Sequence, residues 1–535
     1  MLLAAPLAAP AQQPEPEPAK RAGVVQALSA RYHFAEKYGV AGVPTQPELL
    51  TQYRVAARET TKISREKAEG APQVDQSVLQ SIYAERVARV NKDGFVGEVV
   101  RRYEQAKLNS TVRFTSYKTK WLEGLTVLYR LQNRLSPQIL SLSDRSLRQQ
   151  EYEQISLQPF LPVLATMLPR TPSRVGDTWQ LTRASLWALV GEMPLEEGFE
   201  VTAELREVRN DDPGKPMMAV IDVRGDFQLA EGSSAVNAQI SFTFQPSAAR
   251  ARGRAAPGAG SQDQPGTAKS EADAGSGATY EARGYVSKIR MAQVISMTAP
   301  GDGARLKQTI DRSLILERRT SSPDDGAQPP LAIPDPAPAP SVANSWLLYD
   351  DPQGRFHLLY PQEFRVAKVY PDGGIDLLDP RPDGQDVIQV NPVPKGPEAQ
   401  RDRLPADPQQ EKKLLEEDWR KRGEKVLPGP AGWLPEADWS ASKRRVYRIE
   451  AALVPDEDSG RGPVPAGGRI YMDRYIVQFL RNEVIRVTAM TTRDPHVAFR
   501  DQAESLIRTF EFGPSPGAVP AARAEPGGSG PGPGR

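Results

Sequence analysis

Residues Trp346–Phe364, WLLYDDPQGRFHLLYPQEF, mark the point at which the chain divides into two parts. Two short apolar runs flank the polar segment DDPQG. Pro352 fixes φ at the second position of a turn, and Gly354 eases the exit from that turn. The stretch therefore predicts a β-hairpin, and we expect this hairpin to open a C-terminal domain.

The segment before this hairpin is rich in proline, which indicates a linker. Residues 321–343 read SSPDDGAQPPLAIPDPAPAPSVA, and such a composition favours a semi-rigid extended spacer of ~3 Å per residue. At 535 residues the chain is also too long for one core. The predicted organisation is a signal-peptide remnant and spacer (1–20), an antiparallel β-rich domain (21–320) with a disordered insert (249–278), the linker (321–343), the C-terminal domain (344–513) and a disordered tail (514–535).

The N-terminal half has the clearest strand patterns. Apolar residues alternate with polar ones over 221–229 and again over 236–244, which is typical of an antiparallel sheet with one face on a core. Gly232-Ser233 between them suits a hairpin turn. Residues 146–167 predict the best helix of this half. We expect a mainly antiparallel β domain, with a half-barrel wrapped over that helix as one form of it.

The C-terminal half predicts a mixture of strands and helices. A charged helix over 409–422 precedes several strands, and an apolar stripe from Phe499 to Phe510 predicts a terminal helix. In the strand over 470–480, alternate residues share one face, where Asp473 interrupts an otherwise apolar and aromatic pattern. The expected fold class of the chain is accordingly α+β, with a C-terminal α/β sandwich.

Two sets of motifs carry a family resemblance. Phe356…Tyr360-Pro361 at the start of 344–513 and Ile507–Phe512 at its end resemble the PsbP-like (DcrB-like) domains, and this resemblance implies a binding module. The turn VGDTW, Val175–Trp179, looks like one found in uncharacterised exported bacterial β-rich domains, and it predicts a tight turn with Trp179 buried against the sheet. The N-terminal domain is LolA-like in outline only.

Composition excludes several functional classes. Lys+Arg 68 against Asp+Glu 67 leaves a formal charge of +1, so no global field favours nucleic acid. The chain has no cysteine, which excludes disulfides, thiolate metal sites and cysteine nucleophiles. The three histidines, His33, His357 and His496, lie far apart, so a metal or triad site would have to be assembled from distant segments. We predict no metal and no cofactor.

Enzyme motifs give little support for catalysis. The chain has no GxxxxGK[ST] phosphate loop, and its two SxxK matches, Ser64–Lys67 and Ser440–Lys443, lack SDN and KTG partners. The acidic pair Glu196-Glu197 and the acidic run Asp456–Asp458 fall in Gly/Pro-rich segments typical of solvated loops. We therefore predict no catalytic residues and a protein that is not an enzyme.

Two tryptophans form a candidate contact patch. Trp433 and Trp439 flank Pro435 and stand outside the alternating strand patterns. An exposed pair of this kind predicts a protein-binding surface. The alternative is that both rings belong to the core or anchor a loop.

These observations favour a non-enzymatic, exported protein of a bacterial cell envelope or periplasm that binds another protein through its C-terminal domain. The N-terminus, MLLAAPLAAPAQQPEPEP, has an apolar run and an Ala9-Pro10-Ala11 ending that a signal peptidase accepts. No stretch reaches the ~18 apolar residues of a transmembrane helix. The first alternative is a carrier of a lipid or other apolar ligand in the N-terminal domain, and the second is a hydrolase without recognisable motifs.

Overall fold

The structure is a computed structural model of the chain. It describes residues 30–36, 51–66, 72–90, 96–110, 122–132, 136–156, 158, 160–169, 171–190, 199–210, 215–229, 232–248, 279–300, 305–321, 329–379, 386–392, 408–421, 424–435, 444–455, 469–479, 483–492 and 496–513. The predicted signal-peptide remnant and spacer (1–20), insert (249–278) and tail (beyond 513) lie outside these residues.

The chain divides into two compact units. The first comprises residues 1–138 and 156–337, and the second comprises residues 139–155 and 338–535. The segment 139–155, which the sequence analysis assigned to the N-terminal domain, thus groups with the C-terminal residues. Part of the predicted linker packs on the first unit, because Leu331 is buried and its backbone N–H donates to Gln52 Oε1 at 2.8 Å.

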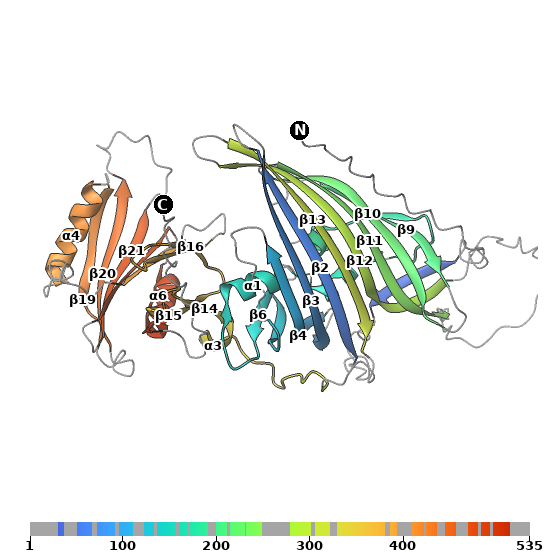
Figure 1. Cartoon of the computed structure of the whole chain (residues 1–535), viewed down its shortest axis with the longest axis horizontal. Coiled ribbons are helices and arrows are strands. Elements are labelled where there is room, and N and C mark those ends of the chain that lie inside the picture. Colours follow the sequence, from blue (N-terminus) through green and yellow to red (C-terminus); the bar gives the residue numbers. More distant parts are fainter. Residues whose placement is uncertain are drawn as a thin grey trace, which may run out of the picture. The chain divides into compact units, whose positions relative to one another are not determined.

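The first unit is built on a twelve-stranded sheet whose long strands lie side by side and curve across the unit (Figure 1). Its main path runs β6-β5-β4-β3-β2-β13-β12-β11-β10-β9-β8, and β1 pairs with β12 in parallel. The strands are β1 (Arg31–Glu36), β2 (Gln52–Arg65), β3 (Gln73–Val90), β4 (Val96–Ser110), β5 (Thr126–Gln132), β6 (Ser136–Ser141), β8 (Thr178–Gln180), β9 (Glu200–Arg209), β10 (Met217–Leu229), β11 (Gly232–Ala248), β12 (Thr279–Pro300) and β13 (Arg305–Thr320).

The two best strand predictions are confirmed. Residues 221–229 lie in β10 and 236–244 in β11, and the two strands pair antiparallel with Ile221 opposite Ile240. The predicted turn position is wrong, since Gly232 and Ser233 already belong to β11 and pair with Leu229 and Gln228. Period-2 alternation fixed the strands correctly but not the residue at which the ladder closes.

The predicted helix over 146–167 is wrong as a single element. The segment instead holds β7 (Leu147–Arg148), α1 (Gln149–Ser156) and the 3₁₀ helix η1 (Leu161–Met167). Pro159 and Pro162 explain the break, because proline lacks the N–H that a continuous helix requires. Together with α2 (Arg183–Val190), η1 contributes Leu161, Leu164 and Leu186 to the core of the first unit, each fully buried.

The second unit contains two sheets. The smaller has the order β23-β15-β14-β7, and its β7–β14 pair is parallel. The larger has seven strands in the order β16-β17-β18-β22-β21-β20-β19. Besides β7, the strands are β14 (Trp346–Asp350), β15 (Phe356–Pro361), β16 (Arg365–Val369), β17 (Ile375–Leu378), β18 (Val387–Pro392), β19 (Glu424–Trp433), β20 (Arg444–Pro455), β21 (Ile470–Phe479), β22 (Val484–Thr491) and β23 (Glu511–Phe512). The described helices are α3 (Val342–Ser345), α4 (Pro408–Lys421) and α6 (Val497–Thr509), together with all but the last residue of α1.

The predicted hairpin is confirmed as β14 and β15, which pair antiparallel. Gly354 has φ +67° and donates its N–H to the carbonyl of Asp351 at 2.8 Å, so it closes the turn as expected. The Asp351 carboxylate accepts from the backbone N–H groups of Gln353 and Arg355 and from the Arg355 guanidinium. Asp351 therefore stabilises the turn by accepting hydrogen bonds from its backbone and from the Arg355 side chain.

Helices cover both faces of the seven-stranded sheet. Figure 1 shows α4 alongside β19 and β20, where Leu415 packs with the buried cluster that includes Tyr447, Ile449 and Met472. Alternate residues of β21, among them Asp473 and Tyr475, point to the opposite face, where α6 supplies Arg500 to Asp473. The prediction that this set shares one face is confirmed, and the ion pair explains the charged interruption.

The expected α+β class is wrong. The residues that the structure describes are mostly antiparallel β structure, with 64% of them in strands and 14% in helices. The physical reason is strand length: β3 runs for 18 residues and β12 for 22, whereas α1 and α2 have eight residues each. Alternation in the sequence located strands but underestimated their lengths, so the predicted fold class gave the helices too large a part of the structure.

Candidate functional site

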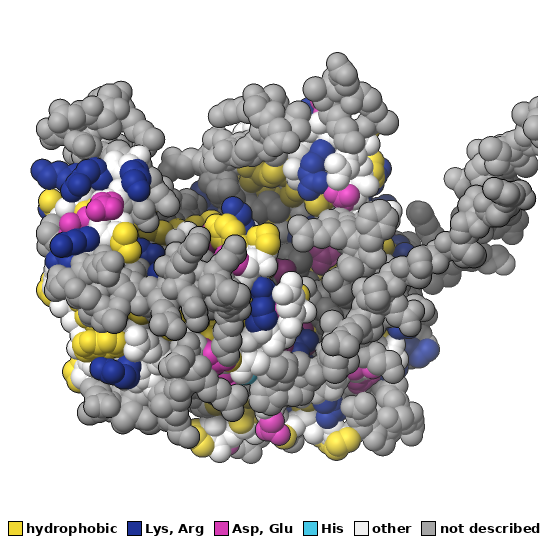
Figure 2. All heavy atoms as spheres, turned by 60° about the vertical axis from the view of Figure 1, so that its left-hand side comes forward, with side chains coloured by type: hydrophobic (Ala, Val, Ile, Leu, Met, Phe, Trp, Pro, Cys, Tyr) yellow, Lys and Arg dark blue, Asp and Glu magenta, His cyan; other side chains and the backbone are white. Residues whose placement is uncertain are grey.

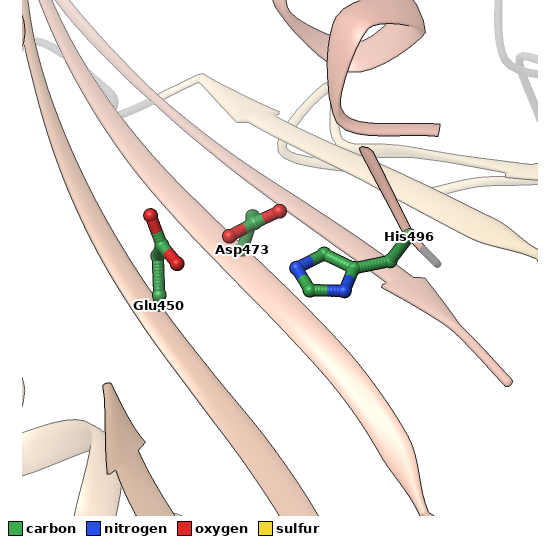
Figure 3. Close-up of side chains that lie close together, drawn as sticks. All are labelled: Glu450, Asp473 and His496. Carbon is green, nitrogen blue, oxygen red and sulfur yellow. The ribbon is translucent and has the colours of Figure 1, made fainter. Parts of the chain in front are cut away.

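Three metal-ligand types from distant segments meet in the second unit (Figure 3). Glu450 on β20 and Asp473 on β21 are directly opposite each other in the ladder, and His496 precedes α6. One ligand atom from each lies within 4.8 Å of the others. With Arg500 of α6, these residues form what we call the β20–β21 charge cluster.

Arg500 contacts all three ligand-type residues of the cluster. Its Nε donates to Asp473 Oδ2 at 3.0 Å, and its Nη2 lies 2.9 Å from Glu450 Oε2. The same Nη2 donates to His496 Nε2 at 2.8 Å, so that nitrogen acts as the acceptor. The His496 ring is also stacked on Tyr471 at 4.6 Å between centroids. The guanidinium therefore occupies the position from which a cation would bind these donors.

A second arginine extends the network. Arg448 lies 2.7 Å from Glu450 and donates to Glu504 of α6 at 3.0 Å. Burial lowers the pKa of Arg500, but its hydrogen bonds and ion pair with Asp473 outweigh that effect and raise the pKa overall. Burial likewise raises the pKa of the neighbouring Tyr475, with the nearby Asp473 charge acting in the same direction. Arg500 therefore stays charged, and the Tyr475 phenol stays protonated.

This arrangement clamps a helix rather than prepares an acid or base. Histidine and carboxylate ligands suit zinc, but a metal here would have to displace Arg500 from all three. At the other end of α6, Arg444 donates to the carbonyls of Ile507 and Phe510. Charged groups thus fasten both ends of α6, with a cation at the C-terminus as the helix dipole favours.

The candidate contact residue Trp433 lies at the end of β19, the last strand in the order of the larger sheet. The residue is 41% exposed, with the Arg445 guanidinium 4.5 Å from its ring centroid and the Tyr447 ring edge-on at 5.3 Å. We call Trp433, Arg445 and Tyr447 the Trp433 patch. Trp439 lies outside the described residues, so the pairing of the two tryptophans in one patch stays a prediction.

The structure adds little to the functional interpretation of the other residues singled out from the sequence. Ser64 lies in β2, whereas Lys67, the second SxxK motif and both acidic loop segments lie outside the described residues. His357 is on β15, where its Nδ1 is 3.0 Å from the Gly513 carbonyl. The structure therefore assembles no nucleophile and base from these residues within the part of the chain that it describes.

Sequence reasoning missed a buried charge network in the first unit. Glu85 of β3 lies between two arginines, with Arg101 Nε donating to its Oε2 at 2.8 Å and Arg318 Nη2 lying 3.2 Å from its Oε1. All three side chains have zero exposure. We call these residues the Glu85 network. A charged residue within an inward-facing row of β3 is the signal that could have found it.

Tyrosines surround both arginines of the Glu85 network. Arg101 lies 4.8 Å from the Tyr83 ring centroid and 4.4 Å from that of Tyr129, and Arg318 lies 3.9 Å from that of Tyr53. Such cation–π contacts partly replace the hydration that burial removes. Burial raises the pKa of Tyr83, Tyr103 and Tyr129, so these phenols stay neutral next to the charges.

Comparison with known proteins adds limited information. No protein-family model matches the chain, and no curated protein matches it. Among solved structures, it is similar to cyanobacterial PsbP (CyanoP) from Synechocystis sp. PCC 6803, with 12% identity, 31% of this chain and 92% of that chain covered, and a TM-score of 0.23. A mutant porin of Rh. blastica (7% identity, 82% and 99% covered, TM-score 0.12) and OccK5 (OpdH) of Pseudomonas aeruginosa (6%, 83% and 97%, 0.11) are also similar. At these scores none of the likenesses supports a statement about function.

One finding bears on membranes. In the described ranges, no helix combines the length and the apolar character needed to cross a bilayer.

Proposed function

We propose that this chain is a non-enzymatic, exported binding protein of the bacterial cell envelope, whose PsbP-like C-terminal domain binds another protein. The family assignment rests on the aromatic and turn motifs at the two ends of 344–513, and the location rests on the N-terminal sequence. The binding role rests on the Trp433 patch, which is the observation that carries the proposal.

The Trp433 patch has the properties of an interface centre. Trp, Tyr and Arg are the residues most enriched among those that dominate binding energy between proteins. Here the three side chains hold each other in place, and Trp433 still exposes 41% of its surface. A rigid, half-exposed aromatic ring loses little conformational entropy on binding. In the view of Figure 2, basic, acidic and hydrophobic side chains all occur on the visible surface of the described residues.

The competing classes have less support. The carboxylates of the β20–β21 charge cluster are engaged by arginines, which does not favour a hydrolase. The fully buried Leu161, Leu164 and Leu186 place the first unit's helical segments in its core, where a carrier would need space for an apolar ligand.

Photocrosslinking in the cells that naturally produce the protein tests this proposal. A photoreactive phenylalanine derivative replaces Trp433 in one variant and Trp419, which packs against the core beneath α4, in a matched control. We expect a discrete adduct in the envelope fraction from position 433, reduced by Arg445→Ala and missing from position 419. Identical adduct patterns at the two positions would contradict the binding surface, and recovery of the protein in the cytoplasm would contradict export.

A further inference from the structure

A shallow depression lies on the solvent-exposed face of the twelve-stranded sheet, where the proposed function does not use it. It has a volume of about 300 Å³ and extends over β13, β2, β3 and β4, which are neighbours in the sheet. This volume is at the lower end of the range for small-molecule sites, roughly 300–1,000 Å³. The depression therefore has room for one large side chain of a partner.

The strand register places the lining side chains on one face. One row across β13, β2, β3 and β4 consists of Glu317, Ala56, Ile82 and Gln105. The next row, two residues along each strand, consists of Ile315, Arg58, Gln80 and Lys107. Side chains directly opposite each other in antiparallel strands share a face, with Cβ atoms about 4.5–5.5 Å apart. The short Ala56 side chain thus lies among longer ones, and Ile82 and Ile315 add apolar surface beside it.

The uncompensated charge at this depression is positive. Glu317 is paired with Lys288, and the hydrogen bond from that ammonium lowers the pKa of the carboxyl. Arg58 and Lys107 are both exposed and form no ion pair with another residue in the described ranges. Two cations are therefore available to a ligand, next to an apolar surface on which Ile315 is 47% exposed.

The same face of β2 and β3 already holds a proline-rich segment of this chain. The Leu331 carbonyl accepts from Arg86 at 2.8 Å, and its N–H donates to Gln52. Arg102 of β4 donates to the Pro329 carbonyl at 3.0 Å. Leu331 itself is only 2% exposed. Gln52 and Arg86 are paired in the ladder, four residues or about 13 Å from the depression along their strands. On this face, arginine and amide side chains thus hold a peptide backbone while an apolar side chain is buried.

We propose that the depression binds one large apolar side chain from an acidic segment of a partner protein. The side chain fills the space over Ala56, and flanking carboxylates pair with Arg58 and Lys107. Gln80 and Gln105 both donate and accept, so they match the polar groups of a peptide backbone. An acidic partner is favoured because its charge complements the two available cations. This surface is separate from the Trp433 patch, and neither proposal depends on the other.

Saturation-transfer NMR on the full-length protein tests the inference with blocked pentapeptides as probes. The acidic probes are EELEE, EEIEE and EEFEE, each acetylated at its N-terminus and amidated at its C-terminus. We expect at least one of them to bind, with the central side chain receiving most of the magnetisation. EESEE, which lacks the apolar group, and KKLKK, which reverses the charge, should bind at least tenfold more weakly.

Three variants separate the apolar and the charged parts of the site. Ala56→Leu fills the depression and should weaken binding about tenfold or more, the value of burying one leucine side chain. Arg58→Gln and Lys107→Gln should each weaken binding about two- to fivefold, the value of one exposed ion pair. All three positions are exposed, so none of these changes should unfold the protein.

Matched controls on the same face make the test decisive. Ala292→Leu on β12 and Lys62→Gln on β2 introduce the same changes at exposed positions outside the lining, and both should leave affinity unchanged. Trp433→Ala should also leave peptide binding intact. Failure of all three acidic probes to bind would overturn the inference. So would equal binding of KKLKK, or an effect of Ala56→Leu no larger than that of Ala292→Leu.

Discussion

Replacing Glu85 by glutamine should strongly destabilise the first unit. The change keeps the shape of the side chain, so it creates no cavity, but it removes the negative charge that contacts Arg101 and Arg318. All three side chains are completely buried, and both guanidinium groups would then face a neutral amide. Removing one partner from a buried ion pair costs about 3–5 kcal/mol. For a unit of this size, that loss corresponds to a decrease in melting temperature on the order of 10 °C.

Urea unfolding combined with hydrogen exchange measures this effect in the correct unit. The free energy of opening should fall for amides of β3 and β4, which carry Glu85 and Arg101 opposite each other. Glu317→Gln is the matched control, since Glu317 lies on β13 next to Arg318 but is 61% exposed and pairs with Lys288 at the surface. An exposed pair of this kind contributes about 0–1 kcal/mol.

Two results would refute the reasoning about the Glu85 network. One is a loss for Glu85→Gln no larger than that for Glu317→Gln. The other concerns the triple change Glu85→Leu, Arg101→Met and Arg318→Met, which removes the buried charges together. Because apolar replacement of a whole buried charge network is often neutral or stabilising, the triple variant should be more stable than Glu85→Gln alone. If it is instead less stable, packing rather than electrostatics explains the effect.

Two further predictions concern buried ionisable groups. Burial raises the pKa values of Tyr83, Tyr103 and Tyr129 above the unfolded value of ~10, so their contribution to stability is complete below that pH and is lost as the pH rises. The tyrosinate absorbance should therefore show that part of the 16 tyrosines ionise only as the protein unfolds, and rapid ionisation of all 16 in the folded protein would contradict this. Arg500→Met should cost about 2–4 kcal/mol and reduce hydrogen-exchange protection of α6, because it leaves the nearly buried Asp473 without its guanidinium. The matched control Arg508→Met removes a guanidinium that is 45% exposed and lies 3.7 Å from Glu504, so it should cost much less, and equal losses for the two variants would contradict a clamping role.

The sequence correctly predicted those parts of the fold that a single local pattern determines, such as period-2 alternation or the residues of a turn. Alternation located β10 and β11, and turn chemistry located the hairpin closed by Gly354. It missed β3 because the inward row of that strand contains Ser81 and Glu85, which weaken the alternation. The grouping of 139–155 with the C-terminal residues could not be predicted either, because the pairing of β7 with β14 involves only two residues of each strand and gives no recognisable sequence pattern.

The candidate sites follow the same division. Trp433 could be found because an aromatic residue outside any alternation is visible in one dimension. The meeting of Glu450, Asp473 and His496 could not, because it depends on the register of β20 against β21 and on where α6 begins. The VGDTW turn was recognised as a turn, and Gly176 has the positive φ (+93°) of one, but the hydrogen bond from Trp179 Nε1 to the Met167 carbonyl depends on the position of η1, which the sequence analysis placed inside one longer helix.

A charged residue in an apolar strand face marks a place to look, but it does not by itself mark a functional site. In both units the interruption is a carboxylate that meets an arginine from a neighbouring element: Glu85 meets Arg101, and Asp473 meets Arg500. Each pair is buried and holds elements together, so these charges have structural work that accounts for their presence. The Trp433 patch differs because Arg445 and Tyr447 contact the Trp433 ring while 41% of that residue stays exposed. Groups already paired in the interior stabilise the fold, whereas a rigidly placed ring that still faces solvent can contact a partner, and for that reason the Trp433 patch is the stronger candidate for binding.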